Sequence, residues 1–327
     1  MKKTSMKRLI PLMLAAVMLV TAALALENTT PPVGTNGAPI AQEQCFETCK
    51  NVAYTGRVTA VDPEGDALRY RLSEKPARGS VELCEDGTFV YTPFENKTGK
   101  DRFTFVAEDA VGNVSEPAKV EVRIRKPSTK VTYADMSGVP SYNAAIKLAE
   151  KGVMVGEQIG NSYYFRPDEP VNRSQFMAMA MSALGSEPLA ETLTTGFADD
   201  DAIPTWCKGY VSAAVQQGLV RGYPSEDGRP MFSPDGMVTR AEAAVLLDRM
   251  ISTTDVAVTT FYPDTAAAPA WAFQAAVNLE SAGVIAANAS GALELNTTLT
   301  RGECAELLAG AMEVVEARET SAWWKWF

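Results

Sequence analysis

The sequence contains three copies of a short motif in which an arginine directly follows an Asn or a Thr. The copies are Asn172-Arg173-Ser174-Gln175, Thr239-Arg240-Ala241-Glu242 and Thr300-Arg301-Gly302-Glu303. An Asn or Thr followed three residues later by Gln or Glu, just before an apolar run, predicts a capping box at the start of a helix. Capping accounts for the first and last residues of each copy and leaves the arginine unexplained.

The position of the arginine suggests a bound anion. Arg173, Arg240 and Arg301 each fall at the first helical position, where the helix dipole is positive and a cation is mildly disfavoured. Free N–H groups, the positive helix end and a guanidinium together form a site for a carboxylate or a phosphate. We therefore predict three anion-binding sites, with Glu242 and Glu303 in the same sites. The alternative is a motif that only caps the helix.

The composition excludes most catalytic chemistry. The 327 residues include no histidine, which removes the commonest general base and zinc ligand and the Ser–His and Cys–His nucleophile pairs. A carboxylate-only enzyme would need paired acids in a cleft, whereas the acids of the N-terminal half lie in predicted turns. We expect a protein that is not an enzyme, with no catalytic residue, no metal and no cofactor.

The N-terminus predicts export. Four basic residues precede an apolar run from Leu9 to Val20, and Ala23-Leu24-Ala25 follows. This is the order of a secretory signal peptide and its cleavage site. We predict a signal peptide over 1–25 and a Pro/Gly-rich linker over 26–37. An uncleaved membrane anchor is the alternative, but no other stretch is long and apolar enough to span a bilayer, so we expect no stable membrane insertion after cleavage.

The net charge limits the partners. It is −10 for the whole chain, and loss of the four basic residues of the signal would move it to −14. Such a surface repels nucleic acid and anionic lipid, so we expect no nucleic-acid partner. Any anionic ligand would have to be held at focused sites. The cysteines are five in number and lack metal-type spacing, so we interpret them as structural; they are Cys45, Cys49, Cys84, Cys207 and Cys304.

Residues 38–126 have the pattern of an antiparallel β-sandwich. Six runs of β-branched and aromatic residues alternate with polar ones and are separated by turn clusters such as Asp62-Pro63-Glu64-Gly65-Asp66. Strands at about 10–15-residue spacing favour a sandwich. Asp62, Glu64, Asp66 and Asp109 could offer oxygens to calcium. We favour the alternative, in which these acids form turns.

After Lys126 the pattern becomes helical and repeats. Each copy has an opening aspartate, a Gly followed by two apolar residues, and the arginine motif, and the opening aspartates are 64 and 65 residues apart. This period predicts three helix–loop–helix units over 131–186, 195–252 and 260–316, packed against one another. An aromatic tail over 317–327 has no assigned role.

The repeated marks resemble those of S-layer homology domains. The middle copy carries all of them, as Phe197-Ala198-Asp199, Trp206, Gly218-Leu219-Val220, Phe232-Ser233-Pro234-Asp235 and Val238-Thr239-Arg240-Ala241-Glu242. The resemblance covers residues 131–315. It implies an all-α pseudo-threefold bundle that binds secondary cell-wall polysaccharide, often pyruvylated, in grooves between units.

Residues 52–124 are similar to bacterial cadherin-like or immunoglobulin-like surface modules, on stretches such as Ala60–Leu68 and Asp86–Pro93. Together the two resemblances imply a secreted, non-catalytic surface (S-layer) protein. It would be anchored non-covalently to an acidic glycan linked to peptidoglycan, with a possible protein partner for the β-sandwich. The alternative is a surface adhesin or calcium-dependent binding module in which the β-sandwich carries the main function.

The predicted polymer-binding set combines arginines, opening aspartates, tryptophans and capping glutamates. Its members are Arg173, Arg240, Arg301, Asp135, Asp199, Asp264, Trp206, Trp271, Glu242 and Glu303. For the aspartates, helix capping, orientation of the arginine and contact with sugar hydroxyls remain open; for the tryptophans, core packing and a sugar platform do. The first copy has Pro140 at the tryptophan position, and the third has Leu293 and Leu295 for Phe and Pro. We therefore rank the Arg240 site first, then Arg301, then Arg173.

Overall fold

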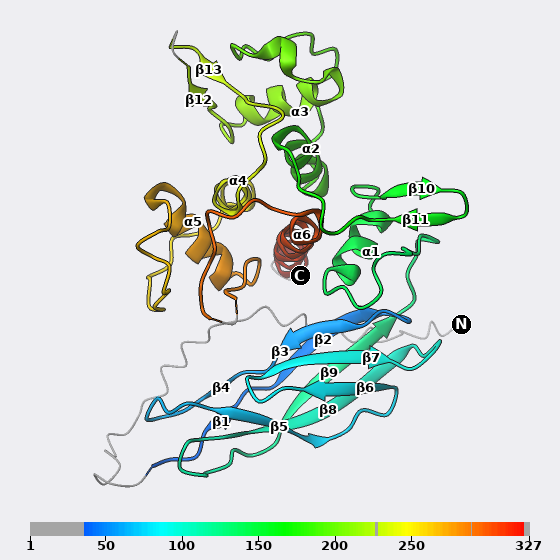
Figure 1. Cartoon of the computed structure of the whole chain (residues 1–327), viewed down its shortest axis with the longest axis vertical. Coiled ribbons are helices and arrows are strands. Elements are labelled where there is room, and N and C mark those ends of the chain that lie inside the picture. Colours follow the sequence, from blue (N-terminus) through cyan, green and yellow to red (C-terminus); the bar gives the residue numbers. More distant parts are fainter. Residues whose placement is uncertain (1–35, 226–227, 289, 324–327) are drawn as a thin grey trace, which may run out of the picture.

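The chain divides into a β domain and a helical region (Figure 1). The computed structural model describes residues 36–225, 228–288 and 290–323, so the predicted signal peptide, most of the predicted linker and the last four residues of the aromatic tail lie outside the described residues. Strands occupy the chain up to Arg125, and the first helix begins at Tyr142. Within the described ranges, no helix is both long enough and apolar enough to cross a membrane.

The β domain is built from two facing sheets. Its strands are β1 (Ile40–Ala41), β2 (Gln44–Cys49), β3 (Tyr54–Arg57), β4 (Ala60–Val61), β5 (Arg69–Glu74), β6 (Gly79–Leu83), β7 (Thr88–Pro93), β8 (Gly99–Glu108) and β9 (Ala118–Arg125). One sheet has the order β2-β9-β8-β5, the other β3-β7-β6, and β1 pairs with β4. Alternate side chains form the core between them, as the period of two in the sequence requires; they include Phe89, Tyr91, Phe103, Phe105, Val120 and Val122.

The expectation of a purely antiparallel sandwich is wrong at one edge. Strand β2 pairs in parallel with β9, from Gln44 opposite Val120 to Cys49 opposite Arg125. Parallel neighbours need a long connection, and here the whole remainder of the domain provides it. The other ladders of the domain are antiparallel.

The acidic loops of this domain form turns. The buried Asp109 carboxylate accepts the N–H groups of Val111, Gly112 and Asn113 at 2.7–2.9 Å. Asp62 similarly accepts two backbone N–H groups of its own turn. Among the described residues, no three or more acidic, cysteine or histidine side chains are grouped to hold a metal. These hydrogen bonds support the turn interpretation.

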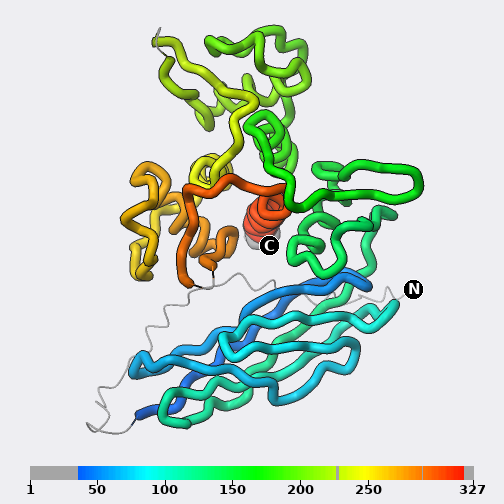
Figure 2. Tube along the Cα trace, viewed as in Figure 1, coloured from blue at the N-terminus to red at the C-terminus, as the bar shows by residue number. Residues whose placement is uncertain are grey.

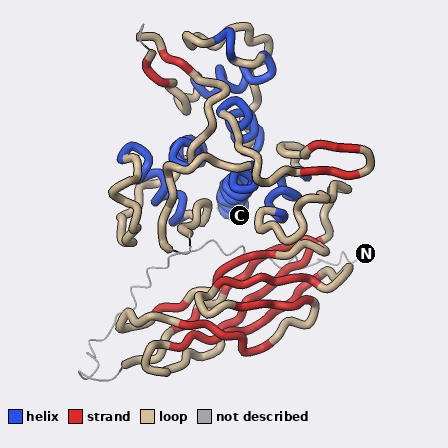
Figure 3. The backbone as a smooth tube through the Cα atoms, in the orientation of Figure 1, coloured by secondary structure: helices blue, strands red, loops and turns tan. Residues whose placement is uncertain are grey.

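The helical region contains α-helices joined by long loops (Figure 3). The helices are α1 (Tyr142–Glu150), α2 (Arg173–Ala183), α3 (Thr205–Gln216), α4 (Arg240–Ile251), α5 (Ala270–Ser281) and α6 (Arg301–Trp323), with a short 3₁₀ turn, η1 (Asp200–Ala202). Helix α6 continues beyond residue 316, where the third unit was predicted to end.

The sequence had suggested an all-α region, but the structure also contains strands there. Strands β10 (Glu157–Ile159) and β11 (Ser162–Tyr164) form a hairpin between α1 and α2, and β12 (Tyr223–Pro224) and β13 (Pro230–Met231) form another between α3 and α4. Gly160, with a φ of 59°, begins the two-residue loop of the first hairpin. Glycine at this position favours a tight hairpin turn.

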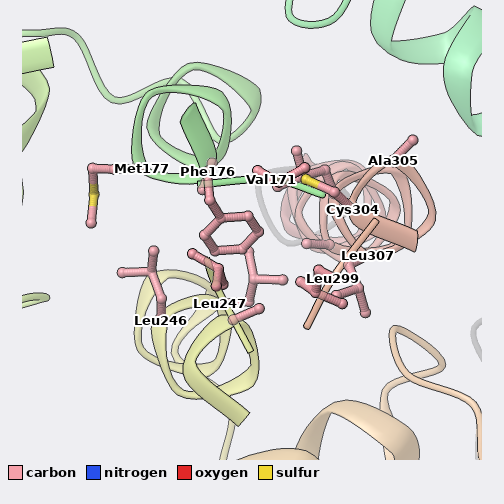
Figure 4. Close-up of a cluster of buried hydrophobic side chains, with 14 of the residues drawn as sticks. Val171, Phe176, Met177, Leu246, Leu247, Leu299, Cys304, Ala305 and Leu307 are labelled. Carbon is pink, nitrogen blue, oxygen red and sulfur yellow. The ribbon is translucent and has the colours of Figure 1, made fainter. Parts of the chain in front are cut away.

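The helices pack in pairs, and each pair joins two neighbouring units. Helix α2 packs against α3, α4 against α5, and α6 against α1. The second helix of each unit therefore contacts the first helix of the next unit. Helices α2, α4 and α6 meet at the centre of the region (Figures 1 and 2). There they bury apolar side chains, among them Val171, Phe176, Leu247, Leu299 and Leu307 (Figure 4).

A closed ring of backbone hydrogen bonds joins the three units at this centre. The Val171 N–H donates to the Leu299 carbonyl at 3.0 Å, the Leu299 N–H to the Val238 carbonyl at 2.8 Å, and the Val238 N–H to the Val171 carbonyl at 3.0 Å. All three residues are buried. The segment before α6 thus takes the same place in the ring as its two counterparts, although the third unit has Leu293 and Leu295 in place of the Phe and Pro of the repeated marks.

The β domain packs directly on helix α1. Cys49, the last residue of β2, and Val52, in the turn between β2 and β3, belong to the buried core of the helical region. The Asn143 side-chain oxygen accepts the Thr48 hydroxyl at 3.0 Å and the Cys49 N–H at 3.1 Å, and its amide donates to the Ala53 carbonyl at 2.9 Å. The β2–β3 turn is therefore fixed to the first turn of α1.

Segments between units make the corresponding contacts elsewhere. In the second unit, the Leu189 N–H donates to the Gly209 carbonyl at 3.1 Å. In the third, the Gln274 amide donates to the Val256 carbonyl at 3.0 Å. The first unit has no unit before it, and the β2–β3 turn takes that place.

The cysteines of the described residues are free thiols. Burial raises the pKa of Cys49 and Cys207 to about 11 and that of Cys304 to about 12. These three thiols pack as small apolar groups. Cys45 and Cys84 are exposed on the β domain.

Candidate ligand-binding grooves

Each arginine motif begins a central helix through a capping box, as the sequence predicts. Asn172 and Gln175 exchange hydrogen bonds at 2.9 and 3.1 Å at the start of α2. Thr239 and Glu242 do so at the start of α4. The same pair of bonds joins Thr300 and Glu303, the residues at the start of α6.

The prediction of free N–H groups at these helix starts is wrong. The Arg173 N–H donates to the Gly236 carbonyl at 2.9 Å. The remaining bonds of this kind run from Ser174 to Pro234, Arg240 to Thr297, Ala241 to Leu295, Arg301 to Glu169, and Gly302 to Pro167. In each case the loop of the next unit satisfies the first two helical donors. Any ligand must therefore be held by side chains, and above all by the arginine.

Each arginine side chain also crosses to the next unit. Arg173 lies over the Tyr223 ring at 4.8 Å and the Phe232 ring at 5.3 Å and donates to the Tyr223 hydroxyl at 2.9 Å. Arg301 lies over the Phe165 ring at 5.1 Å. Arg240 donates to the Ala286 carbonyl at 2.9 Å. The motif of the first unit thus serves the second, that of the second serves the third, and that of the third returns to the first.

The opening aspartates shape the loops that receive these arginines. The Asp135 carboxylate accepts the N–H groups of Phe165 and Arg166 at 2.9 and 2.7 Å. Asp199 binds Phe232 and Ser233 in the same way, and Asp264 binds Leu293 and Glu294. The second residue of each pair has a positive φ, 57°, 58° and 54° in Arg166, Ser233 and Glu294. Such a conformation costs non-glycine residues about 1–2 kcal/mol, and the two hydrogen bonds offset this cost.

Sequence reasoning did not identify this role of the aspartates. The sequence offered no direct signal, because the left-handed conformation that these non-glycine residues adopt after the aromatic or Leu is seen only in the structure. The carboxylates are therefore committed to the loop backbone, which places direct contact with sugar hydroxyls second among their possible roles.

The Arg173 groove, as we name it, lies between the first and second units. It encloses about 380 Å³, and its lining includes Arg173, Arg221, Tyr223, Glu242, Arg249 and Trp271. The Arg173 side chain is 17% exposed and lies 3.4 Å from Glu242. Burial lowers the pKa of its guanidinium, while Glu242 and Asp199 raise it. Tyr223 also hydrogen-bonds to Glu242, so this carboxylate fixes both side chains.

The Arg301 groove lies between the third and first units and encloses about 370 Å³. It is lined among others by Arg301, Phe165, Arg166, Glu157 and Glu169. Arg166 is paired with Glu169 at 2.9 Å and with Glu157. The two positive charges of this groove are therefore balanced by the negative charges of two glutamates.

The surroundings of Arg240, which we name the Arg240 groove, are more acidic. Partial desolvation raises the pKa of the Glu306 carboxyl, Arg240 lowers it, and Glu303 adds to the rise. Glu306 therefore lies close enough to both Arg240 and Glu303 for electrostatic interaction. The Arg240 guanidinium is held by a backbone carbonyl, and Leu293 stands where the other two loops have a phenylalanine.

The tryptophans are not core residues. Trp206 is 57% exposed at the start of α3, and Trp271 is 63% exposed at the start of α5. Trp271 comes from the third unit and lines the Arg173 groove. An exposed indole next to a guanidinium offers a flat apolar surface beside a cation, which suits an acidic sugar.

Comparison with known proteins agrees with the two regions. A bacterial Ig domain model matches residues 36–123, and an S-layer homology domain model matches 132–177 and 196–244. The surface-layer 125 kDa protein of Lysinibacillus sphaericus is 27% identical over 35% of this chain and 9% of its own length. The cellulosome-anchoring protein of Acetivibrio thermocellus is 26% identical over 38% of this chain and 27% of its own.

A third relative is an enzyme. Exoglucanase XynX of Acetivibrio thermocellus is 30% identical over 62% of this chain and 20% of its own length. The chain thus spans less than a third of each of these three relatives. Among solved structures, the SrpA adhesin of Streptococcus sanguinis is 15% identical over 31% of this chain and 62% of that one, with a TM-score of 0.23, too low to support a functional comparison.

Proposed function

We propose, from the premise that this chain is a bacterial Ig domain followed by S-layer homology domains, that it is held non-covalently to the cell wall by an acidic, pyruvylated polysaccharide. The polymer would lie in the grooves between units. Residues 260–316 would be a third S-layer homology repeat after those at 131–186 and 195–252, completing a pseudo-threefold bundle. Residues 1–25 would direct export.

The observation that carries this proposal is the crossing of each motif arginine into the next unit. Arg173 and Arg301 are each oriented by an aromatic ring and open onto a cavity. A guanidinium binds a carboxylate through two parallel hydrogen bonds, and a pyruvyl ketal has one carboxylate. The exposed face of Trp271 provides a surface for the sugar ring. Two surface relatives, a surface-layer protein and a cellulosome-anchoring protein, agree with this role.

The proposal includes the absence of catalysis. The resemblance to the exoglucanase extends over one fifth of that enzyme. Both matched domain families are surface modules. The two glutamates of the Arg301 groove, Glu157 and Glu169, are both paired with Arg166, so they do not form the free acid pair that glycoside hydrolysis uses.

Co-sedimentation of the full mature chain with purified cell wall tests the proposal. Wall that retains its acidic polymer should pull the chain down, and wall stripped of that polymer should release it. Arg173→Gln combined with Arg301→Gln should abolish retention. A matched control is Arg69→Gln on the β domain, whose side chain is 79% exposed; it should bind normally. Equal retention by stripped wall would overturn the proposal.

A further inference from the structure

We infer that the three grooves are not equivalent: the Arg173 groove is the carboxylate-binding site, with Arg221 and Trp271 as ligand-contacting residues, and the Arg240 groove does not bind an anion. This inference rests on the proposed function and deepens it. It reverses the order that the sequence suggested, in which the Arg240 site ranked first.

The charge of the lining differs between the grooves. The Arg173 groove contains three arginines, Arg173, Arg221 and Arg249, and one glutamate, Glu242. The Arg301 groove contains two arginines and two glutamates. Near Arg240, Glu306 interacts electrostatically with the guanidinium, and Ala286 stands at the position that Arg221 has in the second unit. On a chain of net charge −10, an excess of positive charge at one groove concentrates anions there and not elsewhere.

Arg221 is the residue that sets the Arg173 groove apart. It follows Gly218-Leu219-Val220, and the residues at the same place in the other units are Val155 and Ala286. It is exposed, and within the described parts of the chain it has no hydrogen bond or ion pair. By contrast, Arg249 donates to the Leu219 carbonyl at 2.9 Å and supports the loop. Arg221 is therefore the cation that a ligand can engage without breaking an existing contact.

The Arg240 groove lacks each of these features. Pro140 stands at the position in the first unit that corresponds to Trp271, and Ala286 stands where the Arg173 groove has Arg221. Gly310 replaces Arg249, and a Cβ at this position would lie 3.2 Å from the Val284 Cα. Helix α6 therefore packs closely on the loop after α5 of its own unit, and Arg240 joins the second unit to this loop through the Ala286 carbonyl. Its role is to connect two units.

The arrangement identifies the ligand class of the Arg173 groove as a carboxylate-bearing sugar. Arg173 and Arg221 are the two cations that face it, and Trp271, contributed by the third unit, provides the stacking surface. The Arg301 groove, with balanced charge, suits an uncharged part of the same glycan.

Calorimetric titration of the full mature chain with purified wall polymer tests this inference. The polymer is used in two forms, native and with its carboxyl groups reduced to alcohols. Arg221→Gln should weaken binding of the native polymer at least tenfold and leave binding of the reduced form within twofold of wild type. Trp271→Ala should weaken both forms. Arg240→Gln should bind both like wild type, and thermal melting checks that each variant is folded.

The outcomes separate the inference from the proposed function. If wild type binds neither form of the polymer, the proposed function is wrong. If wild type binds the native polymer and Arg240→Gln loses as much affinity as Arg221→Gln, the proposed function survives and the inequality of the grooves is wrong. If Arg221→Gln loses equal affinity for both forms, Arg221 does not bind the carboxylate.

Discussion

The Arg173 and Arg240 grooves have the same backbone construction and different side-chain chemistry. In both, a capping box begins a central helix, the first two helical N–H groups bind the loop of the next unit, and an aspartate holds that loop. One groove combines Arg221 and Trp271 with its arginine; the other has Ala286 and Pro140 in their places. Repetition of a backbone thus does not imply repetition of a binding site.

The largest expected effect comes from removing the central arginines of the two grooves. Arg173→Gln should weaken binding of native wall polymer by roughly tenfold to a hundredfold, because a hydrogen bond to a charged group contributes about 1.5–3 kcal/mol. Arg240→Gln should change the affinity by less than twofold and lower the melting temperature instead. Calorimetric titration and thermal melting of both variants measure this difference. Equal losses of affinity would make the two grooves equivalent.

The shared backbone construction predicts equal effects at the opening aspartates. Asp199→Asn and Asp264→Asn should each cost about 1–3 kcal/mol of stability, because one of the two backbone N–H groups that each carboxylate accepts would then face an amide N–H. Chemical denaturation of the two variants measures the cost. A loss confined to Asp199→Asn would show that the third loop does not depend on its aspartate as the second does.

The contact between the β domain and the first unit extends the comparison to a non-repeated partner. Asn143→Ala removes hydrogen bonds to Thr48, Cys49 and Ala53, and we expect a loss of about 1–3 kcal/mol in stability. Gln274→Ala, at the corresponding place in the third unit, is the matched control and should cost less, because its partner is a single linker segment and Asn278. Urea unfolding followed by tryptophan fluorescence compares them.

A transfer of charge would sharpen the comparison of the grooves. Ala286→Arg combined with Glu306→Gln should give the Arg240 groove an excess of positive charge. We expect a severalfold gain in affinity for native polymer at low ionic strength, which should disappear at high salt because exposed charges are screened. A gain that persists at high salt would contradict an electrostatic origin.

The smallest effect concerns acid stability of the second unit. Hydrogen bonds from Lys208 and Thr195 lower the pKa of Asp200 to about 2. A carboxyl whose pKa is lower in the folded than in the unfolded state stabilises the fold above its unfolded pKa, and this contribution is lost as the pH falls towards 2. Asp200→Asn should therefore lower the melting temperature slightly at pH 6 and match wild type at pH 2. An unchanged difference at both pH values would contradict this origin.

The sequence by itself determined the local features of this protein. Periods of two and of 3.6 distinguished the β domain from the helices, and the Asn/Thr-x-x-Gln/Glu pattern located the starts of α2, α4 and α6, because capping depends on residues three positions apart. The spacing of the aspartates revealed the repeat. These features depend on neighbours along the chain.

Only the tertiary structure decided which residues form a site together. The sequence assigned Arg240 to the unit that carries every mark. In the structure, each motif arginine contacts the next unit instead, so Arg173 lies over Phe232 and lines the same groove as Arg221, both of which belong to that unit. Contacts between neighbouring units also satisfy the N–H groups at the helix starts. At the first unit, the β2–β3 turn makes the corresponding contact with α1. The physical reason is that each unit buries its apolar face and satisfies its helix ends only against the next unit. Which arginine meets which loop is a property of the closed ring.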